Sequence, residues 1–151
     1  MNGDIKGAFL SDTDDTDLVG SGELVTNGTF DTDTSGWTSF TTPLASSTIS
    51  VVDSKLRMTK TGASAGWCYQ ALTGLTVGAT YFVSVDQLNN NSSVTISDAE
   101  GSVKSEDIVV STGYGSAGTR TLVFVATATT LYVNLGTTVS TSDFDNVSVK
   151  L

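Results

Sequence analysis

Short runs in which every second residue is apolar recur along this chain, and they constrain its fold more than any other feature. Tyr81, Val83 and Val85 share one strand face, and the same spacing recurs in the runs 122–126 and 131–135. Successive side chains of a strand point to opposite faces, and polar residues such as Ser84, Asp86, Thr121 and Asn134 fall on the other face, so these strands are largely one-sided. Sheets built from such strands bury their apolar faces by packing together. The pattern therefore predicts an all-β fold, a two-sheet antiparallel sandwich or jelly roll.

Turn-forming residues separate these runs and place the predicted strand boundaries. Gly, Asn, Asp and Ser stand between the runs, whereas Val, Thr and aromatic residues, which suit pleated surfaces, dominate within them. No segment has a convincing helical period, and no internal repeat stands out. The predicted strands are 24–26, 37–41, 48–52, 55–60, 66–72, 80–87, 93–97, 107–111, 120–126, 130–135 and 144–150.

The first residues differ from the rest of the chain. The 151 residues fit one domain with its own core, but an acidic run and a Gly20-Ser21-Gly22 joint set the beginning apart. We predict an N-terminal arm over 1–22 and a β-sandwich over 23–151. The arm is either a disordered acidic tail that keeps the protein soluble or a tether whose apolar residues bind a partner. Those apolar residues are Ile5, Phe9, Leu10, Leu18 and Val19.

The charge balance disfavours two classes of partner. The net charge is −9 and the chain has only seven Lys and Arg residues, so it is poorly suited to nucleic acid or to an anionic membrane. The first residues lack a basic stretch followed by an apolar one, which predicts synthesis without a secretory signal. No apolar run approaches the length of a membrane span.

The residue types argue against an enzyme. The chain has no histidine, which excludes Ser-His and Cys-His nucleophile pairs. Its single cysteine, Cys68, follows Trp67 in a predicted strand and is expected to be a buried small residue. Glycoside hydrolysis needs two carboxylates across one bond, and no such pair on a shared strand face is evident.

Four fragments, in order, carry a family resemblance. They are "LVTNGTF" followed by "GW" (24–37), "LTGLTVGATYFVSVD" (72–86), "RTLVFVATATTLYVNL" (120–135) and "DFDNVSVKL" (143–151). Together they resemble the jelly-roll superfamily of carbohydrate-binding modules that accompany xylanases and β-glucanases. The resemblance runs from about residue 23 to residue 151 and implies the same sandwich fold.

The resemblance also implies a structural calcium ion between the first and last strands. In that superfamily main-chain oxygens and a carboxylate hold the ion, at positions that correspond here to Thr29, Ser54 or Lys55, and Asp145. Such hard oxygen ligands suit calcium. The family often has Gly where Ser54 stands. The alternative is that Asp145 only hydrogen-bonds the turn amides.

Aromatic residues give a candidate glycan site. Trp37 and Phe30 are expected in the core. Trp67 and Tyr69 lie on the strand face opposite Leu72, where two rings can form a platform for a sugar. The alternative is that a loop such as 89–93 or 113–118 covers these rings. The predicted glycan-binding residues are Phe40, Trp67, Tyr69, Gln87 and Asn134.

Two functions follow from these features. The arm favours a virion structural protein, namely a bacteriophage capsid decoration or cement protein or a tail or fibre module. It would bind capsid or other virion proteins in many copies on the virion surface, after synthesis in the host cytoplasm. The alternative is a soluble, extracellular glycan-binding module that recognises a polysaccharide through surface aromatics. Neither function involves catalysis.

Overall fold

The computed structural model describes residues 22–100 and 107–151, and within them all regular structure is β-strand. No helix among these residues is long and apolar enough to cross a membrane. The predicted partner-binding residues Ile5, Phe9, Leu10, Leu18 and Val19 lie outside the described residues. The strands are β1 (Thr38–Ser39), β2 (Ser47–Val51), β3 (Leu56–Lys60), β4 (Gly66–Thr73), β5 (Thr80–Gln87), β6 (Ser92–Ser97), β7 (Ile108–Ser111), β8 (Gly118–Val125), β9 (Thr130–Thr137) and β10 (Thr141–Lys150).

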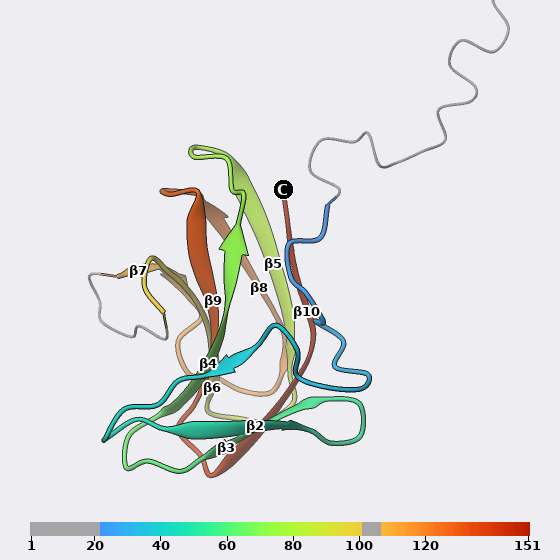
Figure 1. Ribbon diagram of the computed structural model, residues 1–151, viewed down its shortest axis with the longest axis vertical. Helices are drawn as coiled ribbons and strands as arrows, with labels where there is room; N and C mark the ends of the chain where they lie inside the picture. The colour runs from blue at the N-terminus through green and yellow to red at the C-terminus, as the bar shows by residue number, and fades with distance from the viewer. Residues whose placement is uncertain (1–21, 101–106) are drawn as a thin grey trace, which may run out of the picture.

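The strands form two five-stranded antiparallel sheets (Figure 1). The first sheet has the order β1-β4-β9-β6-β7, and the second has the order β2-β3-β10-β5-β8. All strand pairs are antiparallel, so the predicted jelly-roll sandwich is confirmed.

The core lies between the sheets and follows the alternation in the sequence. Val83 and Val85 of β5 are buried, and so are Leu131, Val133 and Leu135 of β9. The side chains between them in sequence face outward or pack against covering loops. The period of two therefore decides which side of each strand enters the core.

The predicted core aromatics close one end of this core. Phe30 is completely buried and Trp37 is 6% exposed. Their ring centroids are 5.5 Å apart in a tilted arrangement. The indole nitrogen of Trp37 donates to the carbonyl oxygen of Asn27 at 3.3 Å, which satisfies its polar atom.

The opening segment runs antiparallel to the last strand. The amide of Leu24 donates to the carbonyl oxygen of Val149, and the amide of Val147 donates to that of Gly28. A Cβ at Gly28 would lie 2.0 Å from the Val147 oxygen, so this close approach requires glycine. In Figure 1 the opening segment, in blue, runs beside the end of β10 at the C-terminus.

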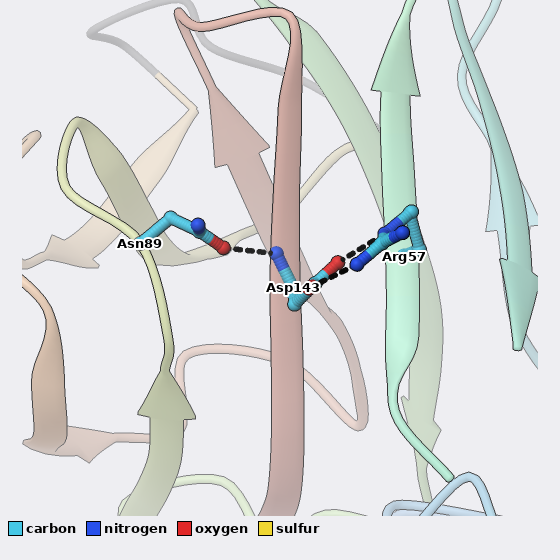
Figure 2. A network of polar contacts seen from close by, with 3 residues as sticks. All are labelled: Arg57, Asn89 and Asp143. Atoms are coloured by element: carbon cyan, nitrogen blue, oxygen red, sulfur yellow. Dashed lines mark hydrogen bonds and ion pairs between the residues drawn. The ribbon is translucent and has the colours of Figure 1, made fainter. Parts of the chain in front are cut away.

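A polar network ties β10 to its surroundings. The Asp143 carboxylate accepts hydrogen bonds from Nε and Nη2 of Arg57, each at 2.7 Å, and the Asp143 amide donates to Oδ1 of Asn89 at 2.6 Å. Figure 2 shows Asp143 between these two partners. Arg57 and Asp143 are directly opposite in the β3–β10 pair, so register alone brings them together.

Candidate functional site

The outer face of the first sheet gathers aromatic and polar side chains. Across β4 and β9, Trp67 lies opposite Gly136, Tyr69 opposite Asn134, and Ala71 opposite Tyr132. Residues directly opposite in an antiparallel pair share a face. We call this surface the aromatic face, and its members are Phe40, Trp67, Tyr69, Tyr132, Asn134, Thr95 and Ser97.

Strand register brings most of the predicted glycan-binding residues together on this face. The amide of Phe40 donates to the carbonyl oxygen of Trp67 at 2.9 Å, which continues the β1–β4 register and sets the two residues side by side. Tyr69 and Asn134 form the neighbouring pair. Thus Phe40, Trp67, Tyr69 and Asn134 share one surface, as a common binding site requires.

Gln87 does not join the aromatic face. It belongs to β5 of the second sheet, and it shares the core-facing parity of Val83 and Val85. Its side chain is completely buried, and its Oε1 accepts a hydrogen bond from Nε of Arg120 at 2.9 Å. The residue lies at the inner side of a strand end, so it is not available to a glycan on the other sheet.

Trp67 is covered by a loop, which was the predicted alternative to an exposed platform. Its side chain is only 5% exposed although it lies outside the core between the sheets. The indole packs over Gly136, where an added Cβ would lie 2.4 Å from Cζ3 of the ring. From the loop before β8, Tyr114 lies over the indole with ring centroids 6.0 Å apart. Trp67 therefore supports the face from below and does not itself present a platform.

Phe40, Tyr69 and Tyr132 are the aromatic residues of this face that remain half-exposed. The rings of Tyr69 and Tyr132 meet edge to face with centroids 5.9 Å apart. The Tyr69 hydroxyl donates to Oε2 of Glu100 at 3.1 Å. Burial raises the pKa of Tyr69 above its ordinary value, and the hydrogen bond to Glu100 adds to this effect. The Tyr69 phenol therefore stays protonated near neutral pH and keeps its hydrogen bond to Glu100.

Beside these rings, Asn134 is completely buried and only half satisfied. Its Nδ2 donates to the Ser97 hydroxyl at 2.8 Å and to the Tyr132 carbonyl at 3.2 Å. Its Oδ1 has no hydrogen-bond partner among the described residues. An unpaired buried carbonyl costs roughly 1–3 kcal/mol. Because the oxygen is buried, a ligand hydroxyl would pair with it only after the side chains that cover it move aside.

The sequence did not point to Tyr132 or Glu100, and it indicated Tyr114 only as part of the covering loop 113–118. A signal for Tyr132 was available, because it has the same parity as Asn134 and the opposite parity to the core residues of β9. Tyr114 and Glu100 lie outside the strands, so no periodicity predicts where they pack.

The predicted calcium ligands converge on one stretch of β10. Opposite β3, the register runs to Phe144 against Leu56, so Asp145 follows beside the β2–β3 turn. Val147 then pairs with Gly28, next to Thr29. Asp53 and Ser54 both have positive φ in that tight turn, an arrangement that suits a two-residue hairpin. The register therefore brings the other two predicted positions, Thr29 and the turn at Ser54 and Lys55, beside Asp145.

The residues around Asp145 suit calcium mainly through their main-chain oxygens and less through their side chains. Among residues 22–100 and 107–151, no three His, Cys, Asp or Glu side chains gather into a metal site. The Asp145 carboxylate accepts the Asn146 amide at 2.8 Å, and the Thr29 hydroxyl donates to Asp31 at 2.7 Å. Carbonyls with one or two carboxylates are ligands that calcium accepts.

Cys68, the single cysteine, is placed as expected for a structural residue. It is completely buried within the core between the sheets. Burial raises the pKa of its thiol far above the ordinary value, so the nucleophilic thiolate is suppressed.

The chain is similar to known proteins in its three-dimensional structure, but the sequence comparisons find no match. No family model matches the chain, and no curated protein matches it. Among solved structures, a CBM4 module is 19% identical with a TM-score of 0.58, covering 83% of this chain and 97% of the module. These likenesses establish the jelly-roll fold.

Two further structures contain the fold as part of a longer chain. The CBM22-1-GH10 modules of Clostridium thermocellum xylanase 10B, complexed with xylohexaose, are 16% identical with a TM-score of 0.62, over 85% of this chain and 28% of that one. The enzymatically active domain of bacteriophage CBA120 tailspike protein 4 is 16% identical with a TM-score of 0.60. The match covers 84% of this chain but spans only about a fifth (21%) of the tailspike chain.

Proposed function

We propose that this protein is a non-catalytic carbohydrate-binding module that holds a glycan on the aromatic face. The observation that carries the proposal is the half-exposed pair Tyr69 and Tyr132 beside the unpaired Oδ1 of Asn134. Several of the similar solved structures are carbohydrate-binding modules by name. This supports glycan binding over the virion role that the arm predicted first.

The chemistry of the face suits a neutral sugar. A pyranose ring presents C–H groups that pack on an aromatic face, and its hydroxyls both donate and accept hydrogen bonds. Tyr69 and Tyr132 supply the rings, the Tyr132 hydroxyl supplies a donor, and the Tyr69 hydroxyl, which donates to Glu100, offers its oxygen as an acceptor. No step of bond making or breaking is involved.

The test is affinity electrophoresis of the full chain against soluble xylan and β-glucan, with titration of xylohexaose. We expect retardation by at least one polysaccharide, and its loss in Tyr132→Ala. Phe82→Ala, which removes an exposed ring from the opposite sheet, is the matched control and should bind normally. Folding of each variant is checked by circular dichroism. Equal binding by Tyr132→Ala and the parent protein would contradict this assignment of the site.

A second candidate function is a virion structural role. The specific observation in its favour is that a phage tailspike chain contains this fold as about a fifth of its length. In that role the predicted arm over 1–22 would attach the sandwich to a capsid or tail protein. Co-sedimentation of the purified protein with intact phage particles tests it: particle binding that survives excess polysaccharide supports the virion role, and no binding argues against it.

We also propose that a structural calcium ion binds near Asp145. Supporting this are the register that gathers Thr29, Ser54 and Asp145, and the oxygen-rich donor set. A ligand that binds only the folded state adds about 2.7 kcal/mol at a hundredfold excess over its Kd. Calcium should therefore raise Tm in the parent protein and in Asp98→Ala, a control at the end of β6, but not in Asp145→Ala. An unchanged Tm with calcium and with chelator would exclude the ion.

A further inference from the structure

A second surface lies on the other side of the sandwich from the aromatic face. The outer face of the second sheet carries a groove of about 390 Å³. Register arranges its outward side chains in two rows across β10, β5 and β8. One row is Lys150, Phe82 and Val123, and the other is Ser148, Ser84 and Thr121. We call this surface the Phe82 groove.

The Phe82 groove exposes an unusual amount of apolar side chain. Phe82 is 59% exposed and Val123 is 52% exposed, and Val125 continues the patch at 51%. Strand β8 is also the edge of its sheet, and its eight-residue pairing with β5 has no bulge. A contiguous apolar patch beside a sheet edge usually has something that covers it.

The described chain begins at the rim of this groove. The Glu23 carboxylate accepts hydrogen bonds from the Ser148 hydroxyl at 2.6 Å and from the Val149 amide at 2.8 Å. It also lies 3.8 Å from Nζ of Lys150. Ser148 and Lys150 both line the groove, so Glu23, near the start of the described residues, lies at this rim.

We infer that the Leu18-Val19 pair of the N-terminal segment occupies the Phe82 groove of its own chain. Val19 and Glu23 are four Cα–Cα steps apart, which can span roughly 13–14 Å. Neighbouring strands are about 4.8 Å apart, so β5 lies roughly 10 Å from the opening segment, across β10. Val19 can therefore reach Phe82 and Ser84, with Gly20, Ser21 and Gly22 as the joint.

Charge and chemistry favour this occupant over a glycan or a second molecule. Asp17 precedes Leu18 in the sequence, and Lys150 supplies a cation at the groove. The groove is mainly apolar, and the Ser148 hydroxyl already donates to Glu23, which leaves little for sugar hydroxyls. A segment tethered at the rim also has a high effective concentration, which a separate molecule lacks.

Disulfide trapping in the full-length protein tests the inference. Val19→Cys is paired with Ser84→Cys in the groove, and the control pairs Val19→Cys with Ala71→Cys on the outer side of the first sheet. Cys68 is completely buried and does not interfere. After mild oxidation we expect an intramolecular disulfide in the groove pair, at about tenfold the yield of the control pair, equivalent to about 1.4 kcal/mol.

A further variant separates apolar docking from mere proximity. Adding Leu18→Ser to the groove pair should lower the yield of the intramolecular disulfide severalfold, because the segment loses its main apolar side chain. Three results would overturn the inference: equal yields in the two cysteine pairs, cross-linked dimers in place of monomers, or a yield unaffected by Leu18→Ser.

Discussion

The two outer faces of this sandwich have the same origin in the sequence but different structures. Both consist of the side chains that alternate with core residues along the strands. On the aromatic face, Trp67 is 5% exposed beneath Tyr114, whereas on the second sheet Phe82 is 59% exposed. Alternation therefore specifies which side chains face outward, but the loops decide which of them reach solvent.

The largest expected difference is in stability, between Trp67→Ala and Phe82→Ala. Truncating a buried aromatic costs about 3–5 kcal/mol, and we expect Trp67→Ala at the lower end because it lies outside the core between the sheets. Phe82→Ala should cost less than about 1 kcal/mol, since the ring is mostly exposed. Urea denaturation of both variants measures the difference. Similar midpoints would mean that the cover over Trp67 contributes little.

A smaller effect is expected from Gly136→Ala, which crowds the aromatic face. The new Cβ would lie 2.4 Å from the Trp67 ring, so the indole has to move toward Tyr114. Such overpacking typically costs about 1–3 kcal/mol. Ser84→Ala, at the centre of the other outer face, is the control and should have little effect. Thermal denaturation of both variants distinguishes the faces, and a stable Gly136→Ala protein would show that the indole is loosely held.

Alkaline pH should loosen the aromatic face. Burial raises the pKa of Tyr114 above its ordinary value, so the folded state holds this proton more tightly than the unfolded state. The stabilisation is complete below about pH 10 and is lost as the pH rises through the folded-state pKa. Trp67 fluorescence should shift toward a water-exposed signal above pH 10. A Tyr114→Phe variant should lack this step, and an identical transition in that variant would implicate another group.

Acidic pH should act on the other face, with the smallest effect. Asp86 lies on the outer side of β5, and its pKa is lowered mainly by the hydrogen bond from Thr119 and further by the one from Asn146. The resulting stabilisation is present above about pH 4 and is lost as the pH falls through the depressed folded-state pKa. In a plot of Tm against pH, Asp86→Asn should therefore reduce the fall in Tm at acidic pH and leave the fall at alkaline pH unchanged. Loss of the fall at alkaline pH would contradict the separation of the faces.

Much of the fold could be predicted because it depends on local alternation. The strand at 80–87 has the predicted bounds, and Leu72 enters the core while Trp67 and Tyr69 do not. The predicted segment 24–26 pairs with β10 through only isolated hydrogen bonds and is not a regular strand. Boundaries elsewhere differ by a few residues, as expected where turn geometry ends the pairing.

The candidate site was less predictable because it depends on contacts between distant segments. Nothing near Trp67 in the sequence indicates that Tyr114 covers it, and the orientation of Gln87 required knowing that β5 stays regular to its last residue. The buried state of Asn134 likewise depends on β6 pairing with β9, which alternation within one strand does not specify.

The most direct test of the glycan proposal is to map a bound oligosaccharide by NMR. In a titration of the isotope-labelled full chain with xylohexaose, or with whichever glycan retards the protein in electrophoresis, we expect the amide shifts of Tyr69, Tyr132 and Asn134 to change. Those of Phe82 and Val123, on the opposite sheet, should stay constant. Shifts concentrated at the Phe82 groove, or no saturable shift with any glycan of the panel, would contradict the account.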